Sequence, residues 1–357
     1  MTRRQIAHLA CTAAVVATGL GAAAPTAAHS TVHRVKPGQS IQKAVDAAKP
    51  GDTVLLSPGV YRESVRITTS NLTLRGSGIF PTVIEPGKAA DRAAAGNACA
   101  EAGNGICVAG SENRPVERVT IRSLTLRGFT ANGLWATWTD RLKIRHVVAD
   151  KNGKWGIGLE RAVRGEFRHN ITRNNGDAGL FLANTVDREH GSTDARGTLI
   201  SHNLTSGNRI GITVRRLRNV TVERNHVTKN CAGVFVVGDE SKPRARATLR
   251  RNLVEANNKY CPKTPRLPFL QGSGIVLTGA EETLVERNRV VDNVGSSPLS
   301  GGIVLFKSFV GAPNEQNEIR DNVVLRNGTA DLADRDTGVG NSFTGNTCKV
   351  SEPTGMC

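Results

Sequence analysis

Gly156-Ile-Gly-Leu159 and Gly179-Leu-Phe-Leu182 are two copies of a short pattern, glycine followed by apolar residues at the next and third positions. Seven copies begin at Gly133, Gly156, Gly179, Gly211, Gly233, Gly274 and Gly302. They lie 23, 23, 32, 22, 41 and 28 residues apart, so the underlying period is 22 or 23 residues and the longer gaps contain insertions. A repeat of this length predicts stacked supersecondary units, each of which buries its apolar face against its neighbours.

Paired asparagines form a second repeated element, in which an apolar residue is followed three positions later by Asn and five positions after that by another Asn. The pairs are Asn170 and Asn175, Asn203 and Asn208, Asn225 and Asn230, Asn252 and Asn257, Asn288 and Asn293, and Asn322 and Asn327. Two short alternating apolar runs in each unit favour strands over helices. Six pairs at one offset predict ladders of hydrogen-bonded Asn side chains, which the turn preference of single Asn residues does not explain.

The apolar residues that precede each first Asn by three positions are predicted to point into the core. They are Ile144, Phe167, Ile200, Val222, Leu249, Val285 and Ile319. With these motifs the chain resembles a right-handed parallel β-helix of the pectate-lyase-like superfamily over roughly residues 32–345. The resemblance implies an all-β, single-stranded solenoid of about nine or ten coils, with the glycine motif as the first strand of each coil.

Residues 29–357 are therefore predicted to form one β-helix domain, closed at its C-terminal end by a segment of about residues 329–357. Ser40 is a predicted N-cap, and Ile41, Ala44, Val45 and Ala48 share one face of a short helix over about residues 40–48. The resemblance implies that this helix caps the first coil.

Residues 1–28 are predicted to be a secretory signal, because Arg3 and Arg4 precede a run of small apolar residues. The export route is left open, and no other apolar segment is long enough to span a membrane. If Cys11 is removed with the signal, six cysteines remain. Neighbour pairing is predicted, since each such pair closes a local excursion: Cys99 with Cys107, Cys231 with Cys261, and Cys348 with Cys357.

The chain is strongly basic, with a formal net charge of +16 that falls to +14 when Arg3 and Arg4 leave with the signal. A basic field attracts polyanions. Aromatic residues make up only 4% of the chain and no recognition motif is present, which argues against nucleic acid. An acidic polysaccharide or anionic cell-wall polymer is the predicted partner of a secreted monomer, and a basic but uninvolved surface is the alternative.

Outward residues of the first strands should form columns along the stack. Trp135, Phe181 and Phe235 share one column, and Glu160 and Arg215 share another. The resemblance places substrate grooves over this face, so these rings, with Trp155, are candidates for stacking on sugars. The alternative is that loops fold over the rings as a secondary core.

Lys154, Asp177, Glu160 and Arg215 are the candidate catalytic residues. A polysaccharide lyase needs a base and a cation that neutralises a uronate carboxylate. Lys154 or Arg215 could serve in either role, and Asp177 or Glu160 could bind calcium, the one cofactor left open. The leading interpretation is a lyase, and the alternative is a non-catalytic carbohydrate-binding or structural surface protein.

Several signatures of related enzymes are absent. The sequence has neither the Asp-Asp and Gly-His-Gly motifs of polygalacturonase-like hydrolases nor the Asp-Pro-His-Asp signature of alginate epimerases. A pectate-lyase-like cluster of acidic calcium ligands is also missing. These absences weaken the enzyme interpretation.

A separate column consists of His146, His169 and His202, each directly before a ladder position on consecutive coils. Three stacked imidazoles could bind a transition metal. Arg224, Arg251, Arg287 and Asp321 occupy the same position in later coils, which favours a general surface position at the turn.

Overall fold

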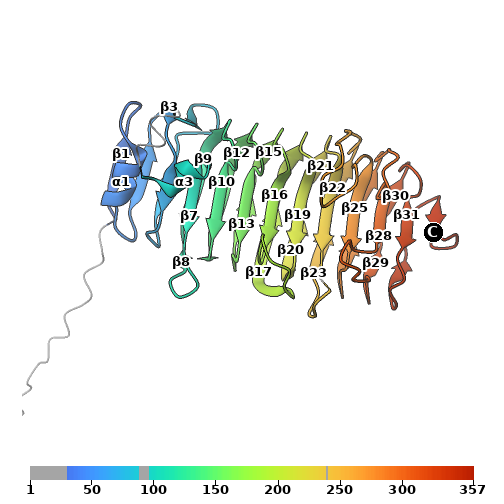
Figure 1. Cartoon of the computed structure of the whole chain (residues 1–357). Coiled ribbons are helices and arrows are strands. Elements are labelled where there is room, and N and C mark those ends of the chain that lie inside the picture. Colours follow the sequence, from blue (N-terminus) through green and yellow to red (C-terminus); the bar gives the residue numbers. More distant parts are fainter. Residues whose placement is uncertain (1–29, 88–95, 239) are drawn as a thin grey trace, which may run out of the picture.

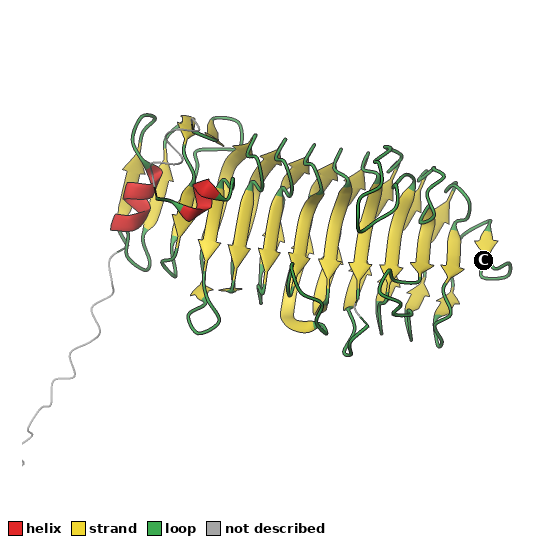
Figure 2. Cartoon of the chain, viewed as in Figure 1, coloured by secondary structure: helices red, strands yellow, loops and turns green. Residues whose placement is uncertain are grey.

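The computed structural model describes residues 30–87, 96–238 and 240–357. The predicted signal and Cys11 lie outside these residues. The strands stack as successive parallel coils along one axis, from the N-terminal end to the C-terminal end (Figure 1). Helices occur only near the N-terminal end of the described chain (Figure 2). The predicted right-handed parallel β-helix is confirmed.

The first strands of the coils form an 11-stranded parallel sheet. Its strands are β4 (Val65–Ile67), β7 (Ile106–Ala109), β10 (Leu134–Thr137), β13 (Ile157–Glu160), β16 (Ala178–Ala183), β19 (Ile210–Arg215), β22 (Ala232–Val237), β25 (Ser273–Thr278), β28 (Gly301–Phe306), β31 (Leu332–Arg335) and β33 (Ser351–Glu352). The sheet has more strands than the predicted nine or ten coils, and two of them, β31 and β33, lie in the segment 329–357 that was predicted only to close the C-terminal end.

The second and third strands of the coils are joined into a 20-stranded sheet. Its strands are β1 (Val32–Val35), β2 (Thr53–Leu56), β3 (Gly59–Arg62), β5 (Thr73–Arg75), β6 (Thr82–Glu85), β9 (Thr120–Arg127), β12 (Lys143–Asp150), β14 (Glu166–Arg168), β15 (Ile171–Arg173), β17 (Thr193–Ser201), β18 (Leu204–Ser206), β20 (Leu217–Glu223), β21 (His226–Thr228), β23 (Arg246–Arg250), β24 (Leu253–Glu255), β26 (Leu284–Glu286), β27 (Arg289–Val291), β29 (Glu318–Arg320), β30 (Val323–Leu325) and β32 (Ser342–Thr344). The short strands β8 (Val116–Glu117) and β11 (Thr139–Asp140) pair separately.

The register of the 11-stranded sheet matches the predicted columns. Trp135 pairs with Gly158, which pairs with Phe181, and the same column continues to Phe235. All seven predicted inward residues, from Ile144 to Ile319, are fully buried. A period of 22 or 23 residues with insertions therefore fixes which side chains lie above one another.

The two Asn columns form continuous ladders. Asn225 illustrates the pattern: its Oδ1 accepts hydrogen bonds from the backbone N and the Nδ2 of Asn203, both at 2.9 Å. Its own Nδ2 donates to Asn252 Oδ1 and to the carbonyl of Ile200, each at 3.0 Å. Every buried amide in the column thus satisfies both a neighbouring amide and the backbone of the bend.

The motif glycine is required by the neighbouring coil. A Cβ on Gly156 would lie 2.7 Å from the carbonyl oxygen of Gly179 and 2.8 Å from Nδ2 of Asn175. A side chain at this position would therefore collide with the backbone and with the second Asn ladder. The two repeated sequence elements are parts of one packing arrangement.

The predicted helix is α1 (Ile41–Ala47), with Ser40 as its N-cap accepting from the backbone N of Lys43. It lies at the N-terminal end of the stack and buries Ile41 and Val45 (Figure 1). Glu63 Oε1 also accepts from the backbone N of Ile41 at 2.6 Å, which ties the helix start to the strands. Its role as a cap stays a prediction.

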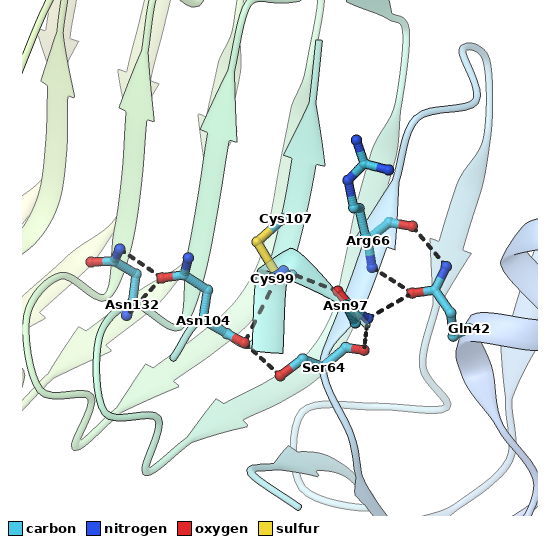
Figure 3. The surroundings of a disulfide bond; sticks show 8 residues. All are labelled: Gln42, Ser64, Arg66, Asn97, Cys99, Asn104, Cys107 and Asn132. Atoms are coloured by element: carbon cyan, nitrogen blue, oxygen red, sulfur yellow. Dashed lines mark hydrogen bonds between the residues drawn. A yellow bond between two sulfur atoms is a disulfide. The ribbon is translucent and has the colours of Figure 1, made fainter. Parts of the chain in front are cut away.

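A second helix, α3 (Ala98–Glu101), is held by the Cys99–Cys107 disulfide (Figure 3). In the same region Asn97 Nδ2 donates to the carbonyl of Ser64 at 3.0 Å. The Cys231–Cys261 and Cys348–Cys357 bridges are also formed, so the predicted pairing of the six cysteines is confirmed. Within the described ranges, no helix combines the length and apolar character needed to cross a membrane.

Candidate functional site

An open groove of about 810 Å³ lies over the outward face of the 11-stranded sheet. Its floor includes side chains of β16, β19, β22 and β25, and its ends are lined by Lys154 and by Val310. One wall is the segment after β16, represented by Val186 and Glu189, and the opposite wall is residues 264–267 before β25. The insertions between the glycine motifs therefore build the sides of the groove.

The structure brings six of the eight predicted site residues to this groove. They are Lys154, Trp155, Asp177, Phe181, Arg215 and Phe235. Trp135 and Glu160 do not line it. Trp135 lies on β10, one coil beyond the Lys154 end of the groove, and its ring packs against that of Trp155 at a centroid distance of 5.2 Å.

An aromatic stack forms one end of the groove floor. The rings of Trp155 and Phe181 are stacked with centroids 4.0 Å apart and an interplanar angle of 3°. Lys154 Nζ lies 4.0 Å from the centroid of a Trp155 ring, within cation–π range. Trp155 Nε1 donates to Asp177 Oδ2 at 2.9 Å, which fixes the plane of the indole.

These aromatic rings are largely buried. Trp155, Phe181 and Phe235 are 4%, 7% and 2% exposed and belong to a second apolar cluster outside the main core. The burial corresponds to the alternative in which loops fold over the rings. Sugar stacking by these side chains stays a prediction.

Arg215 and Glu160 hold the wall that follows β16. Arg215 Nη1 donates to the carbonyl of Val186 at 3.3 Å, and its Nη2 lies 3.4 Å from Glu189 Oε1. Glu160 Oε1 accepts from the backbone N of Val186 at 3.2 Å. Glu160 therefore acts as an anchor for this loop, whereas the side chain of Arg215 also reaches the groove.

Arg216 is a residue that the sequence interpretation missed. Its side chain is fully buried, its Nη2 lies 3.0 Å from Glu189 Oε2, and its Nη1 donates to Thr185 Oγ1 at 3.1 Å and to the carbonyl of Arg188. A fully buried guanidinium is rare unless it is paired. Its position just after a first strand gives no signal of this burial.

Arg209 was also missed, and it supports the opposite wall. Its guanidinium donates to the carbonyls of Pro262 at 2.7 Å and Pro268 at 3.3 Å. Burial lowers the pKa of Arg209, and the charge of Asp177 opposes that effect. The sequence did indicate that Arg209 lies beside Lys154 and Asp177, because these three residues follow consecutive members of the second Asn ladder.

Charged groups of both signs converge on the groove. Its lining includes the cations Lys154, Arg209, Arg215 and Arg266 and the anions Asp177, Asp187 and Glu189. A groove lined only by apolar and amide groups would favour a non-catalytic binder. The observed lining instead provides candidates for proton transfer and for neutralising a carboxylate.

The structure offers no preformed metal centre among residues 30–87, 96–238 and 240–357, where no group of three His, Cys, Asp or Glu side chains is placed to hold an ion. The imidazoles of His146 and His169 stack with centroids 5.2 Å apart and an interplanar angle of 8°. His169 and His202 have centroids 5.1 Å apart. Stacked rings direct their in-plane nitrogens side by side, so they do not converge on one metal ion.

Solved structures with a similar fold include three carbohydrate-related enzymes. The A-modules of the Azotobacter vinelandii mannuronan C-5 epimerases AlgE6 and AlgE4 are 18% and 17% identical, with TM-scores of 0.55 and 0.54. Each alignment covers 87% of this chain, and 89% and 90% of the respective A-modules. DFA-IIIase from Arthrobacter chlorophenolicus A6 is 17% identical with a TM-score of 0.57, covering 85% of this chain and 77% of that one. At these identities the likeness concerns the fold alone.

No curated protein matches the sequence. A family model, the right-handed beta helix region, matches residues 64–246 and 190–310, which together span more than half of the chain. The matched residues include the seven glycine motifs and five of the six Asn pairs, and the chain belongs to this right-handed β-helix family.

Proposed function

We propose that the chain is exported, binds a linear acidic polysaccharide in the groove and cleaves it as a polysaccharide lyase. The observation that carries this proposal is the convergence of Lys154, Arg209, Arg215 and Arg266 on one open groove that crosses several coils. An extended groove suits a polymer better than a compact metabolite. The three disulfides support an oxidising, extracytoplasmic location.

Structures of the same fold provide further support. Two of them are mannuronan C-5 epimerases, and mannuronan is an acidic polysaccharide. Because this chain lacks the Asp-Pro-His-Asp signature, we propose elimination for it instead of epimerisation. Both reactions begin by removing the proton beside the uronate carboxylate.

In the proposed elimination, a base removes the proton on the carbon next to the carboxylate. The electron pair of the broken C–H bond forms a C=C bond, the C–O bond to the neighbouring sugar breaks, and the leaving sugar oxygen takes a proton from water. Lys154 lines the groove and is the candidate base, a role that its side chain can fill only as the neutral amine. Arg215 is the candidate cation that neutralises the carboxylate and stabilises the anionic intermediate.

A second candidate function is non-catalytic carbohydrate binding. The observation that favours it is the structural engagement of several predicted site residues: Glu160 anchors a loop, and Phe181 and Phe235 are buried. This function needs the same groove but no proton transfer.

The test is incubation of the purified mature chain with pectate, alginate and glycosaminoglycans, with and without calcium. Absorbance of unsaturated uronate products is followed, and binding is measured separately. We expect product from one of these polymers, and a loss of about 10²–10⁴-fold in Lys154→Met, the range for losing a general base. Lys151→Met is the matched control, because Lys151 is an exposed lysine of the same coil outside the groove.

The outcomes separate the two candidates. Product that Lys154→Met abolishes and Lys151→Met retains supports the lyase. Binding without product supports the non-catalytic binder. Neither binding nor product with any acidic polymer overturns both.

A further inference from the structure

A line of exposed cationic and imidazole side chains runs along a different surface, at the bend between the second and third strands of successive coils. Its six members are His146, His169, His202, Arg224, Arg251 and Arg287, all exposed. We call this line the bend column. None of its residues lines the groove.

The strand register places these side chains directly above one another. The residues before His146 and His169, Arg145 and Arg168, are partners in the sheet, and the residues two positions after them, Val148 and Ile171, are partners as well. The same double registration continues through the later coils to Arg287. Because neighbouring strands are about 4.8 Å apart, the six side chains span about 24 Å.

The side chains of the bend column point away from the core because of their backbone conformation. Each of its residues has a left-handed conformation with φ between 51° and 56°. The following residue, beginning with Asn170 after His169, belongs to the buried Asn ladder in five of the six coils. The column's backbone is therefore flanked by buried ladder residues while its side chains face solvent.

Among the described residues, the six side chains of the bend column form no ion pairs, unlike those beside it, and Asp321, which occupies the next rung after Arg287, lies 4.0 Å from Arg320. At the preceding position, Arg145 pairs with Glu166 at 2.6 Å and Arg250 pairs with Glu223 at 2.7 Å. Within the described ranges, no side chain of the bend column makes a hydrogen bond or an ion pair. Protein surfaces usually intersperse charges of both signs, so an aligned row of unpaired arginines is a cost that an anionic ligand would relieve.

The neighbouring row on the third strand distinguishes between anionic polymers. Four of its six side chains are aliphatic: Ile171, Leu204 and Leu253 are partly exposed and Val148 is buried, while His226 and Arg289 occupy the other two rungs. Proteins that bind single-stranded nucleic acid combine cations with aromatic side chains on which bases stack. This row has no Phe, Tyr or Trp, and its one imidazole, His226, is bound to Glu255 at 2.9 Å. Aliphatic groups beside cations suit a polymer with C–H faces and one acidic group per sugar.

We infer that the bend column is a second binding site, for a linear acidic polysaccharide that lies along the stack of coils. The carboxylates of the polysaccharide would contact successive rungs of the column. Arg224, Arg251 and Arg287 would form the charged part of the site, and the three imidazoles would extend the site along the stack. This inference shares a ligand class with the proposed function of the groove but rests on separate residues.

The test compares two triple variants of the full mature chain that remove the same charge. Arg224→Gln/Arg251→Gln/Arg287→Gln neutralises the column, and Arg34→Gln/Arg75→Gln/Arg114→Gln neutralises three exposed arginines elsewhere. Binding of fluorescent polygalacturonate and alginate is measured at low salt. We expect about tenfold weaker binding in the column variant, from three surface ion pairs, and less than about twofold in the control.

Two further variants distinguish loss of charge from misfolding and the column from the groove. The replacement Arg224→Lys/Arg251→Lys/Arg287→Lys should restore binding, which shows that charge and not misfolding causes the loss. Lys154→Met/Arg215→Gln should retain the column's contribution even if the groove binds nothing. Equal losses in the two Gln variants, no loss in either, or tighter binding of a single-stranded oligonucleotide than of either polysaccharide would overturn the inference.

Discussion

At the scale of single residues, stability depends on buried amides that serve the backbone of two coils at once. Asn225 accepts two hydrogen bonds from Asn203 and donates to Asn252 and Ile200. Its side chain is 1% exposed, so water cannot replace lost partners. Each member of the ladder is therefore needed by the bend before it and the bend after it.

We predict that Asn225→Ala lowers the free energy of unfolding by about 2–4 kcal/mol, because it leaves buried donors and an acceptor unpaired at about 1–3 kcal/mol each. Denaturant-induced unfolding measures the change. Thr221→Ala is the control, since Thr221 lies on the outward side of β20 in the same coil and should change stability by less than about 0.5 kcal/mol. Equal unfolding midpoints for the two variants would contradict a ladder that contributes to stability.

Residues that repeat were predictable, and residues that act once were not. The period alone placed Trp135, Phe181 and Phe235 in one column and Glu160 and Arg215 in another, as the register shows. Arg216 occupies a repeat position at which the other coils have chemically unrelated residues. Its burial against Glu189 therefore depends on how one loop folds. The repeated residues therefore predict the packing that all coils share, whereas the candidate site consists largely of residues that occur in one coil only.

At the scale of elements, the walls of the groove are insertions held by a few specific bonds. The wall before β25 is tied to the stack by the Cys231–Cys261 disulfide, whose cysteines are 30 residues apart. Arg209 adds hydrogen bonds to Pro262 and Pro268 within the same segment. The positions of the insertions were predictable from the gap lengths, but their conformations were not, because no repeated pattern constrains them.

We predict that Cys231→Ser/Cys261→Ser lowers the free energy of unfolding by about 2–4 kcal/mol and also weakens polysaccharide binding in the groove. Loosening the segment should displace the wall that includes Thr264 and Leu267. Denaturant unfolding and binding measurements check the two effects. Cys348→Ser/Cys357→Ser is the control, since its bridge closes only 9 residues at the C-terminal end and should leave groove binding unchanged. Unchanged groove binding in the Cys231/Cys261 variant would contradict a disulfide-supported wall.

At the scale of the whole molecule, the stack has two ends that differ in their electrostatics. Near the N-terminal end, Asp52 accepts hydrogen bonds from the backbone N of Lys49 and Thr31 and from the ring of His33, all at 2.8–2.9 Å. These bonds, led by that from Lys49, lower the pKa of Asp52 from 3.8 to about 2. The carboxylate therefore stabilises the fold above pH 4, and this contribution is lost as the pH falls towards about 2.

At the C-terminal end a carboxyl group has its pKa shifted in the opposite direction. Asp334 occupies the position that pairs with Leu305, an inward residue of the preceding coil. Burial raises the pKa of Asp334, the charge of Asp336 adds to the rise, and a backbone hydrogen bond from Asp336 opposes it. Among the described residues its Oδ1 has no hydrogen-bond partner. Ionisation of Asp334 thus destabilises this end at neutral pH, and protonation relieves the cost as the pH falls through its raised pKa.

In a linear stack each coil contacts only its neighbours, so the two ends should respond to pH separately. Hydrogen exchange, corrected for the intrinsic rate at each pH, should show that acidification from pH 5 to about pH 2 weakens protection near β1 and β2 and strengthens it near β31. Asp52→Asn should remove the acid-dependent loss at the N-terminal end. Asp334→Asn should raise protection at the C-terminal end at neutral pH, with a gain that shrinks in acid because the native carboxyl is then already neutral. A uniform change along all coils would mean that the stack unfolds as one cooperative unit and that neither end titrates independently.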